Sequence, residues 1–305
     1  MAQIITCAGE CMVEFSSTES GLYRRSFAGD TFNTAWYLRR LLPQDVAVDY
    51  VTRIGDDRQS QDMLAFMRES CVGTRHVKVM AGKSCGLYTI ALEAGERSFC
   101  YWRSASAARH LADDPALLQE ALGASDCLVF SGITLAILPP VGREALLAVA
   151  KARKEAGAMV AFDPNIRPRL WSGPDEIRDW LNRAYAVASL ALPSFADEAA
   201  IFGDAKPEAT ATRLAALGVG EIVVKDGGEP SQVVSAAGAS FVPAPAAITP
   251  RDTTGAGDSF NAGYIARRVQ GGTPEQAAAA AHDLAGQVIQ GYGALVPVAI
   301  PHAPH

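Results

Sequence analysis

Residues 252–263 read DTTGAGDSFNAG, and this stretch decides the fold. Apolar residues after it recur with helical spacing, and Gly271-Gly272 ends the pattern. The stretch therefore predicts a glycine-rich loop at 255–257 that opens a helix over about residues 258–270. Small residues at such a place let backbone N–H groups converge on an anion, and the helix dipole adds a favourable potential.

Asp258 stands next to this predicted anion site. A carboxylate beside a bound anion is electrostatically unfavourable unless it accepts a proton from a nucleophile that attacks a phosphoryl group there. The alternative is that Asp258 caps a helix after a glycine turn, because Asp is a favoured N-cap residue. On residues 255–258 alone, both roles of Asp258 are open.

Around this stretch, short β-rich runs alternate with helical patterns along nearly the whole chain. Apolar strands between helices predict a parallel sheet covered on both faces, with ligands beyond the carboxyl ends of its strands. No repeat or linker divides the chain, so one domain over residues 1–305 is expected. The predicted strands are 4–8, 46–54, 127–130, 159–162 and 221–225, and the predicted helices are 31–42, 57–71, 141–155, 258–270 and 274–289.

The segment Ser84 to Arg103 breaks this alternation and predicts a hairpin around Ala94-Gly95. Pairing about that turn places Tyr88 opposite Tyr101. Side chains alternate along a strand, so Arg103 shares their face. Such a face could cover a polar ligand, or it could be an ordinary half-exposed hairpin with cross-strand aromatic pairs.

Composition excludes several classes of function. The 305 residues are 49% hydrophobic and 20% charged, which is typical of a globular chain. A net charge of −6 gives no basic surface for nucleic acid or an anionic membrane. No charged signal start or bilayer-length apolar run is present, and six scattered cysteines favour reduced thiols. A soluble, cytoplasmic protein is therefore expected.

The stretch 252–263 resembles the second signature of the ribokinase/PfkB carbohydrate-kinase family. Residues 28–33 (AGDTFN) resemble the first signature, with Ala28 where Gly is usual, and Lys225-Asp226-Gly227-Gly228 resembles the nucleotide loop. The resemblance implies a ribokinase-like three-layer α/β/α sandwich with a mostly parallel sheet. It also implies a small β-sheet lid built from about 12–28 and 74–106, which is a candidate surface for a homo-oligomer.

The resemblance also assigns chemical roles. Asp258 would be the catalytic base, and Gly255, Ala256 and Gly257 would stabilise the charge on the transferring γ-phosphoryl group of ATP, with Mg²⁺ between the β- and γ-oxygens. Asp252 and Thr254 stand where relatives often bind a monovalent cation such as K⁺. An Asn-x-x-Glu element for metal and phosphate is not matched at Ser194 to Asp197, and Glu198 is its candidate acidic member. The nucleotide side would comprise Asn165, Arg167, Ser194, Lys225, Gly227 and Gly228.

Within the family, segments 9–14, 101–103, 131–138 and 162–171 resemble the branch that phosphorylates the sugar acid 2-keto-3-deoxygluconate. A neutral hexose needs no arginine pair, whereas a carboxylate binds a guanidinium fork with charge assistance. Gly29, Asp30 and Asn33 would face the sugar hydroxyls, and Tyr88, Tyr101, Arg103 and Arg167 would contact the acid.

Other functions are left open. A kinase for a neutral sugar such as fructose or ribose, and a non-catalytic regulator that binds nucleotide or sugar, fit the same fold. A Rossmann dehydrogenase would need GxGxxG after the first strand, and residues 9–14 read GECMVE.

Overall fold

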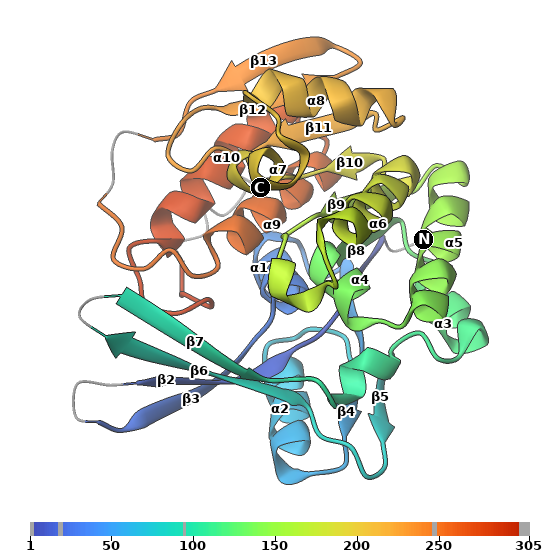
Figure 1. The fold of residues 1–305 in the computed structure, drawn as a ribbon, viewed down its shortest axis with the longest axis vertical. Helices are drawn as coiled ribbons and strands as arrows, with labels where there is room; N and C mark the ends of the chain where they lie inside the picture. The colour runs from blue at the N-terminus through green and yellow to red at the C-terminus, as the bar shows by residue number, and fades with distance from the viewer. Residues whose placement is uncertain (1–2, 18–20, 94–95, 246–248, 299–305) are drawn as a thin grey trace.

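The described residues form two sheets, a larger and a smaller one (Figure 1). The computed structural model describes residues 3–17, 21–93, 96–245 and 249–298. Within these residues the larger sheet has nine strands in the order β13-β12-β11-β10-β9-β8-β1-β4-β5. Their bounds are β1 Ile4–Ala8, β4 Ala47–Gly55, β5 Val77–Met80, β8 Cys127–Ser131, β9 Met159–Asp163, β10 Leu190–Ala191, β11 Glu221–Val224, β12 Ser231–Ser235 and β13 Gly238–Val242.

All pairs from β11 to β5 are parallel, which confirms the predicted sheet. The hairpin of β12 and β13 adds antiparallel strands at one edge. It was not predicted from the sequence, because its Ser-, Gly- and Ala-rich residues have weak strand propensity.

Helices bury the sheet on both faces. One hydrophobic cluster joins Ile5 and Val129 to residues of α1, α9 and α10, and the other joins Leu128 and Phe162 to residues of α5 and α6. Neighbours such as Leu128 and Val129 point to opposite faces, so both faces need apolar strands. The helices are α1 Asp30–Leu41, α2 Arg58–Glu69, α3 Pro115–Leu122, α4 Gly132–Ile137, α5 Pro140–Glu155, α6 Pro174–Val187, α7 Phe195–Phe202, α8 Pro207–Ala216, α9 Ala256–Val269 and α10 Pro274–Val288, with short 3₁₀ turns at Ala107–His110 and Pro168–Leu170.

Helices α9 and α10 approach each other very closely. A Cβ atom on Gly263 of α9 would lie only 2.9 Å from the Cα of Ala281. Ala277, Ala278 and Ala281 of α10 are fully buried. Small side chains therefore bring the two backbones almost into contact.

The smaller sheet forms the predicted lid, in the order β3-β2-β6-β7 (Figure 1). Its strands are β2 Met12–Ser17, β3 Tyr23–Ala28, β6 Gly86–Glu93 and β7 Glu96–Trp102. The register pairs Tyr88 with Tyr101, which confirms the predicted hairpin, while its turn at 94–95 lies outside the described residues. The predicted start of the second lid segment at residue 74 is wrong, because β5 pairs with β4 of the larger sheet.

The chain passes between the two sheets at short segments, such as residues 9–11 between β1 and β2. This arrangement agrees with one domain over 1–305, which stays a prediction. In the described part of the chain, no helix has the length and apolar character needed to cross a membrane.

Candidate active site

The glycine-rich loop opens α9, but the helix starts earlier than predicted. Gly255 is the N-cap residue with a left-handed φ of 75°, and α9 begins at Ala256. A Cβ atom on Gly255 would lie 2.6 Å from the carbonyl oxygen of Ala294, so both conformation and space require glycine. Ala256 and Gly257 therefore lie in the first turn, where backbone N–H groups have no partner inside the helix. The N–H of Ala256 donates to the carbonyl oxygen of Thr253 over 3.2 Å, a long contact that a charged acceptor can replace, so an anion can bind at this turn.

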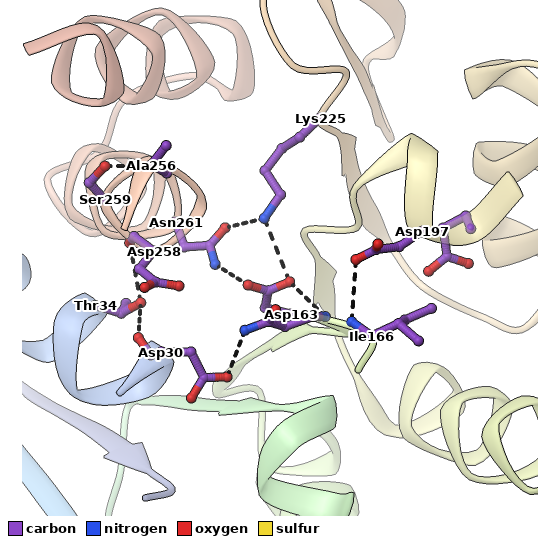
Figure 2. A network of polar contacts seen from close by, with 12 residues as sticks. Asp30, Thr34, Asp163, Ile166, Asp197, Lys225, Ala256, Asp258, Ser259 and Asn261 are labelled. Atoms are coloured by element: carbon purple, nitrogen blue, oxygen red, sulfur yellow. Dashed lines mark hydrogen bonds and ion pairs between the residues drawn. The ribbon is translucent and has the colours of Figure 1, made fainter. Parts of the chain in front are cut away.

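Asp258 lies in the same turn and faces α1 (Figure 2). Its Oδ2 accepts a hydrogen bond of 2.7 Å from Nδ2 of Asn33, and the hydroxyl of Thr34 donates to its carbonyl oxygen over 3.2 Å. Burial, and next the negative charge of Asp30, raise the pKa of Asp258 from 3.8 to about 7. A carboxylate with that pKa can take and return a proton near neutral pH, as a general base requires.

The residues predicted to face the sugar gather at the start of α1. Gly29 packs against the carbonyl oxygen of Glu10, where a Cβ atom would lie at 2.0 Å. Asp30 accepts a hydrogen bond of 3.0 Å from Nδ2 of Asn165, and burial raises the pKa of Asp30. Asn33 reaches Asp258, so α1 brings the predicted sugar-binding groups to the predicted base.

Asn165 was predicted on the nucleotide side, and its side chain donates to the carboxylate of Asp30, which was predicted to face the sugar. Its φ of 32° is positive, which is uncommon for a residue other than glycine. Backbone strain of this kind is concentrated at functional sites.

A second polar cluster lies beside the first turn of α9 (Figure 2). Nδ2 of Asn261 donates to Oδ2 of Asp163 over 2.7 Å, and Nζ of Lys225 donates to Oδ1 of Asn261 over 3.0 Å. Lys225 also lies 3.6 Å from Oδ1 of Asp163, and a Cβ atom on Gly257 would lie 3.8 Å from its Nζ. The Lys225 ammonium therefore stands next to the anion-binding turn.

The nucleotide loop lies next to this cluster. Ser194, the N-cap residue of α7, forms a parallel bridge with Lys225. Gly227 follows with a left-handed φ of 58°. Ser194, Lys225, Gly227 and Gly228 are thus brought together as predicted, whereas Asp163 and Asn261 were not singled out from the sequence.

Glu198 is not at the site. It is fully buried, accepts a hydrogen bond of 2.5 Å from Tyr185 and pairs with Arg213 at 2.6 Å. The acidic residue that faces the site is Asp197, whose Oδ2 accepts from the backbone N–H of Ile166 over 3.3 Å (Figure 2). Burial raises the pKa of Asp197, and the charge of Arg167 opposes that shift. The i,i+3 spacing from Ser194 could have identified it.

The lid presents its aromatic pair as predicted. The rings of Tyr88 and Tyr101 stack with centroids 5.5 Å apart, and Tyr88 is buried while Tyr101 is 46% exposed. The charge of Arg167, which is exposed beyond β9, opposes the burial-driven rise in the pKa of Tyr101. The charge of Arg167 therefore acts on both Tyr101 of the lid and Asp197.

Arg103 has a partner within the protein that the sequence did not indicate. It was predicted to offer its guanidinium to a substrate carboxylate, but Nη2 forms an ion pair with Oε2 of Glu10. The side chain of Arg103 is 9% exposed, and that of Glu10 is fully buried.

The predicted cation-binding residues have structural contacts. Oδ1 of Asp252 accepts from the backbone N–H of Thr254 over 2.8 Å, and Oδ2 accepts from that of Gly293 over 2.6 Å. Asp252 thus joins two loops beside Gly255. Across the described ranges, no group of three or more His, Cys, Asp or Glu side chains is arranged to hold a metal ion.

Comparisons with known proteins agree with this geometry. The 2-dehydro-3-deoxygluconokinase of Escherichia coli K12 is 40% identical over 97% of this chain and 98% of its own length. The 2-dehydro-3-deoxygluconokinase of Dickeya dadantii is 38% identical over 96% of this chain and 97% of its own length. The crystal structure of a PfkB protein from Polaromonas sp. JS666 has a TM-score of 0.83 and 27% identity, over 96% of this chain and 97% of its own.

The architecture is therefore the expected ribokinase-like α/β/α sandwich with a small second sheet. The model of the pfkB family carbohydrate kinases matches residues 3–300. On this match and these relatives, the chain belongs to the pfkB family of carbohydrate kinases and is a sugar kinase.

Proposed function

We propose that the enzyme transfers the γ-phosphoryl group of ATP to the 6-hydroxyl of 2-keto-3-deoxy-D-gluconate. The observation that carries this proposal is the hydrogen bond between Asn33 and Asp258. It joins the sugar-binding end of α1 to the anion-binding turn of α9, so a hydroxyl and a phosphoryl group can meet at Asp258. The names of the relatives from E. coli and D. dadantii support the choice of sugar.

In the proposed reaction, Asp258 removes the proton from the 6-hydroxyl as its oxygen bonds to the γ-phosphorus. The bond from that phosphorus to the β,γ-bridging oxygen breaks, and ADP leaves. Backbone N–H groups at Gly255, Ala256 and Gly257 stabilise the charge on the γ-oxygens because they are already oriented by the helix. Asp258 later releases its proton to water.

The nucleotide would lie along Ser194, Lys225, Gly227 and Gly228, with Asn261 steadying Lys225 and Arg167 within reach of phosphate. When bound with ATP, Mg²⁺ neutralises charge between the β- and γ-oxygens. The carboxylates of Asp163 and Asp197 are hard oxygen donors, which suit Mg²⁺ directly or through water. The charge of Asp163 contributes to the raised pKa of Asp197, so the two carboxylates lie in the same region of the site.

The carboxylate of the sugar acid would lie under the lid, between Arg103 and Arg167. Tyr88 and Tyr101 form an apolar wall there, and excluding water strengthens a guanidinium–carboxylate contact. A neutral sugar would offer neither guanidinium group a substrate carboxylate to bind.

A coupled ADP-release assay with sugar acids and neutral sugars tests the proposal. Arg103→Leu alone would leave the buried carboxylate of Glu10 without its cation, which is strongly destabilising. The double variant Glu10→Gln/Arg103→Leu removes both charges and isolates the substrate contact. It should lower kcat/KM for 2-keto-3-deoxygluconate at least about tenfold, since a charge-assisted hydrogen bond contributes about 1.5–3 kcal/mol. Activity on fructose should fall much less, and a wild type that prefers fructose would refute the proposal.

Three further expectations stay predictions. A K⁺ site at Asp252 and Thr254 predicts higher activity in K⁺ than in a bulky organic cation. A homo-oligomer through the lid would cover Tyr23 and Trp102, which are 54% and 57% exposed, and is tested by light scattering. The expected location is the cytoplasm.

A further inference from the structure

The segment of residues 9–14, GECMVE, carries two buried carboxylates that the reaction above does not use. Glu10 lies between β1 and β2, where the chain leaves the larger sheet for the lid. Arg103 directly follows β7, where the chain leaves the lid. Their ion pair therefore joins the two crossings at the base of the lid.

This pair is closely packed but incompletely hydrogen-bonded. Oε1 of Glu10 and Nε of Arg103 are both buried, and neither has a hydrogen-bond partner among the residues that the structure describes. A Cβ atom on Gly86 would lie 2.6 Å from Oε1 of Glu10 and 3.2 Å from Cβ of Arg103. Gly86 thus leaves the space that the carboxylate fills, and the contact between Nη2 and Oε2 helps to set the orientation of the guanidinium.

Glu14, four residues later, is held differently. Its Oε1 accepts hydrogen bonds from the hydroxyls of Ser16 and Ser26 over 3.0 and 2.8 Å, and its Oε2 accepts from the hydroxyl of Tyr88. Neutral donors on both oxygens satisfy this carboxylate. Glu14 therefore orients the aromatic ring of Tyr88, whereas Glu10 orients the guanidinium of Arg103.

We propose that Glu10 is a positioning residue that determines specificity for sugar acids by acting through Arg103. This inference rests on the proposed function, because it assigns the substrate carboxylate to Arg103. An arginine recognises a carboxylate through the fixed directions of its N–H groups, so an immobilised guanidinium loses less entropy on binding. Without Glu10, the guanidinium would keep its charge and lose its orientation.

The test compares kcat/KM for 2-keto-3-deoxygluconate with kcat/KM for fructose, as a ratio, in folded variants checked by thermal melting. Glu10→Ala should lower the ratio at least about tenfold, toward that of Glu10→Gln/Arg103→Leu. Glu10→Gln, which keeps an acceptor oxygen for Nη2, should stay within about threefold of the wild-type ratio. KM for ATP should change little in each variant.

Glu14→Ala is the matched control, because it truncates a buried carboxylate in the same segment without touching Arg103. It should lower the ratio clearly less than Glu10→Ala does, because the aromatic wall that Glu14 orients carries no charge. A wild-type ratio in Glu10→Ala, or an equal loss in Glu14→Ala, would overturn the role of Glu10 while the proposed function stands. A wild type that prefers fructose overturns both.

Discussion

Replacing Asp258 with asparagine should remove activity and, at the same time, make the fold less sensitive to rising pH. Burial raises the pKa of Asp258 from 3.8 to about 7, so the folded protein binds this proton more tightly than the unfolded chain does. The group therefore stabilises the fold at low pH, and this stabilisation is lost as the pH rises through about 7. Asparagine does not titrate and can still accept the hydrogen bond from Asn33.

The magnitude follows from the size of the pKa shift. Between pH 5 and pH 8 the wild type loses roughly 2–3 kcal/mol of this stabilisation. The value comes from 1.36 kcal/mol for each of the about two pH units between pH 5 and the pKa of about 7. This is an upper value, because Asp258 is only partly buried and solvent screens part of the effect. The free energy of unfolding of Asp258→Asn, relative to wild type, should rise by up to that amount over this range.

Urea unfolding of both proteins at pH 5 and pH 8 measures the difference, in which the other titrating groups cancel. The kcat of Asp258→Asn should fall by about two to four orders of magnitude, the usual contribution of a positioned base. The kcat/KM of the wild type for the sugar should rise with pH through about 7. A stability difference that is the same at both pH values would refute the raised pKa, and a variant that keeps more than half of the wild-type kcat would refute the catalytic role.

Two further predictions concern the lid and the nucleotide side. Sugar acid should slow backbone hydrogen exchange in β7 by closing the lid. The distant hairpin of β12 and β13 is the control, whose exchange rate should not change. Equal exchange in β7 with and without sugar acid would indicate a static lid. Lys225→Met should raise KM for ATP at least about tenfold, because a charge-assisted contact to phosphate is lost, and should leave KM for the sugar within about threefold. Steady-state kinetics with each substrate varied in turn measures both KM values. An equal rise in the two KM values would contradict the assignment of Lys225 to the nucleotide.

The sequence predicted those parts of the protein that depend on local pattern. The hairpin register followed from one glycine turn and the positions of Tyr88 and Tyr101, because strand pairing is fixed once the turn is fixed. The parallel sheet followed from apolar strands between helices. The start of α9 was misplaced by two residues because the glycine-rich loop runs directly into the helix without a side-chain cap.

Pairings between distant residues could not be predicted in this way. Asn33 and Asp258 are 225 positions apart, and Asp163 and Asn261 are 98 apart. No periodicity links such pairs, so their geometry required the tertiary structure. Arg103 could be placed on the lid face, yet its buried partner Glu10 could not be anticipated, because nothing in residues 9–14 indicates which cation they meet. Strand β5 was assigned to the lid because a four-residue strand carries too little pattern to show its sheet.

The close packing of α9 against α10 affects how much reorganisation energy each turnover requires. Gly263 and the alanines of α10 have no side-chain rotamers to lose, so packing these helices carries almost no side-chain entropy penalty. Backbones this close also leave no room for α9 to slide or tilt without a steric clash. The N–H groups proposed to receive the γ-phosphoryl charge are therefore fixed during folding, and little reorganisation energy remains to be supplied in each turnover.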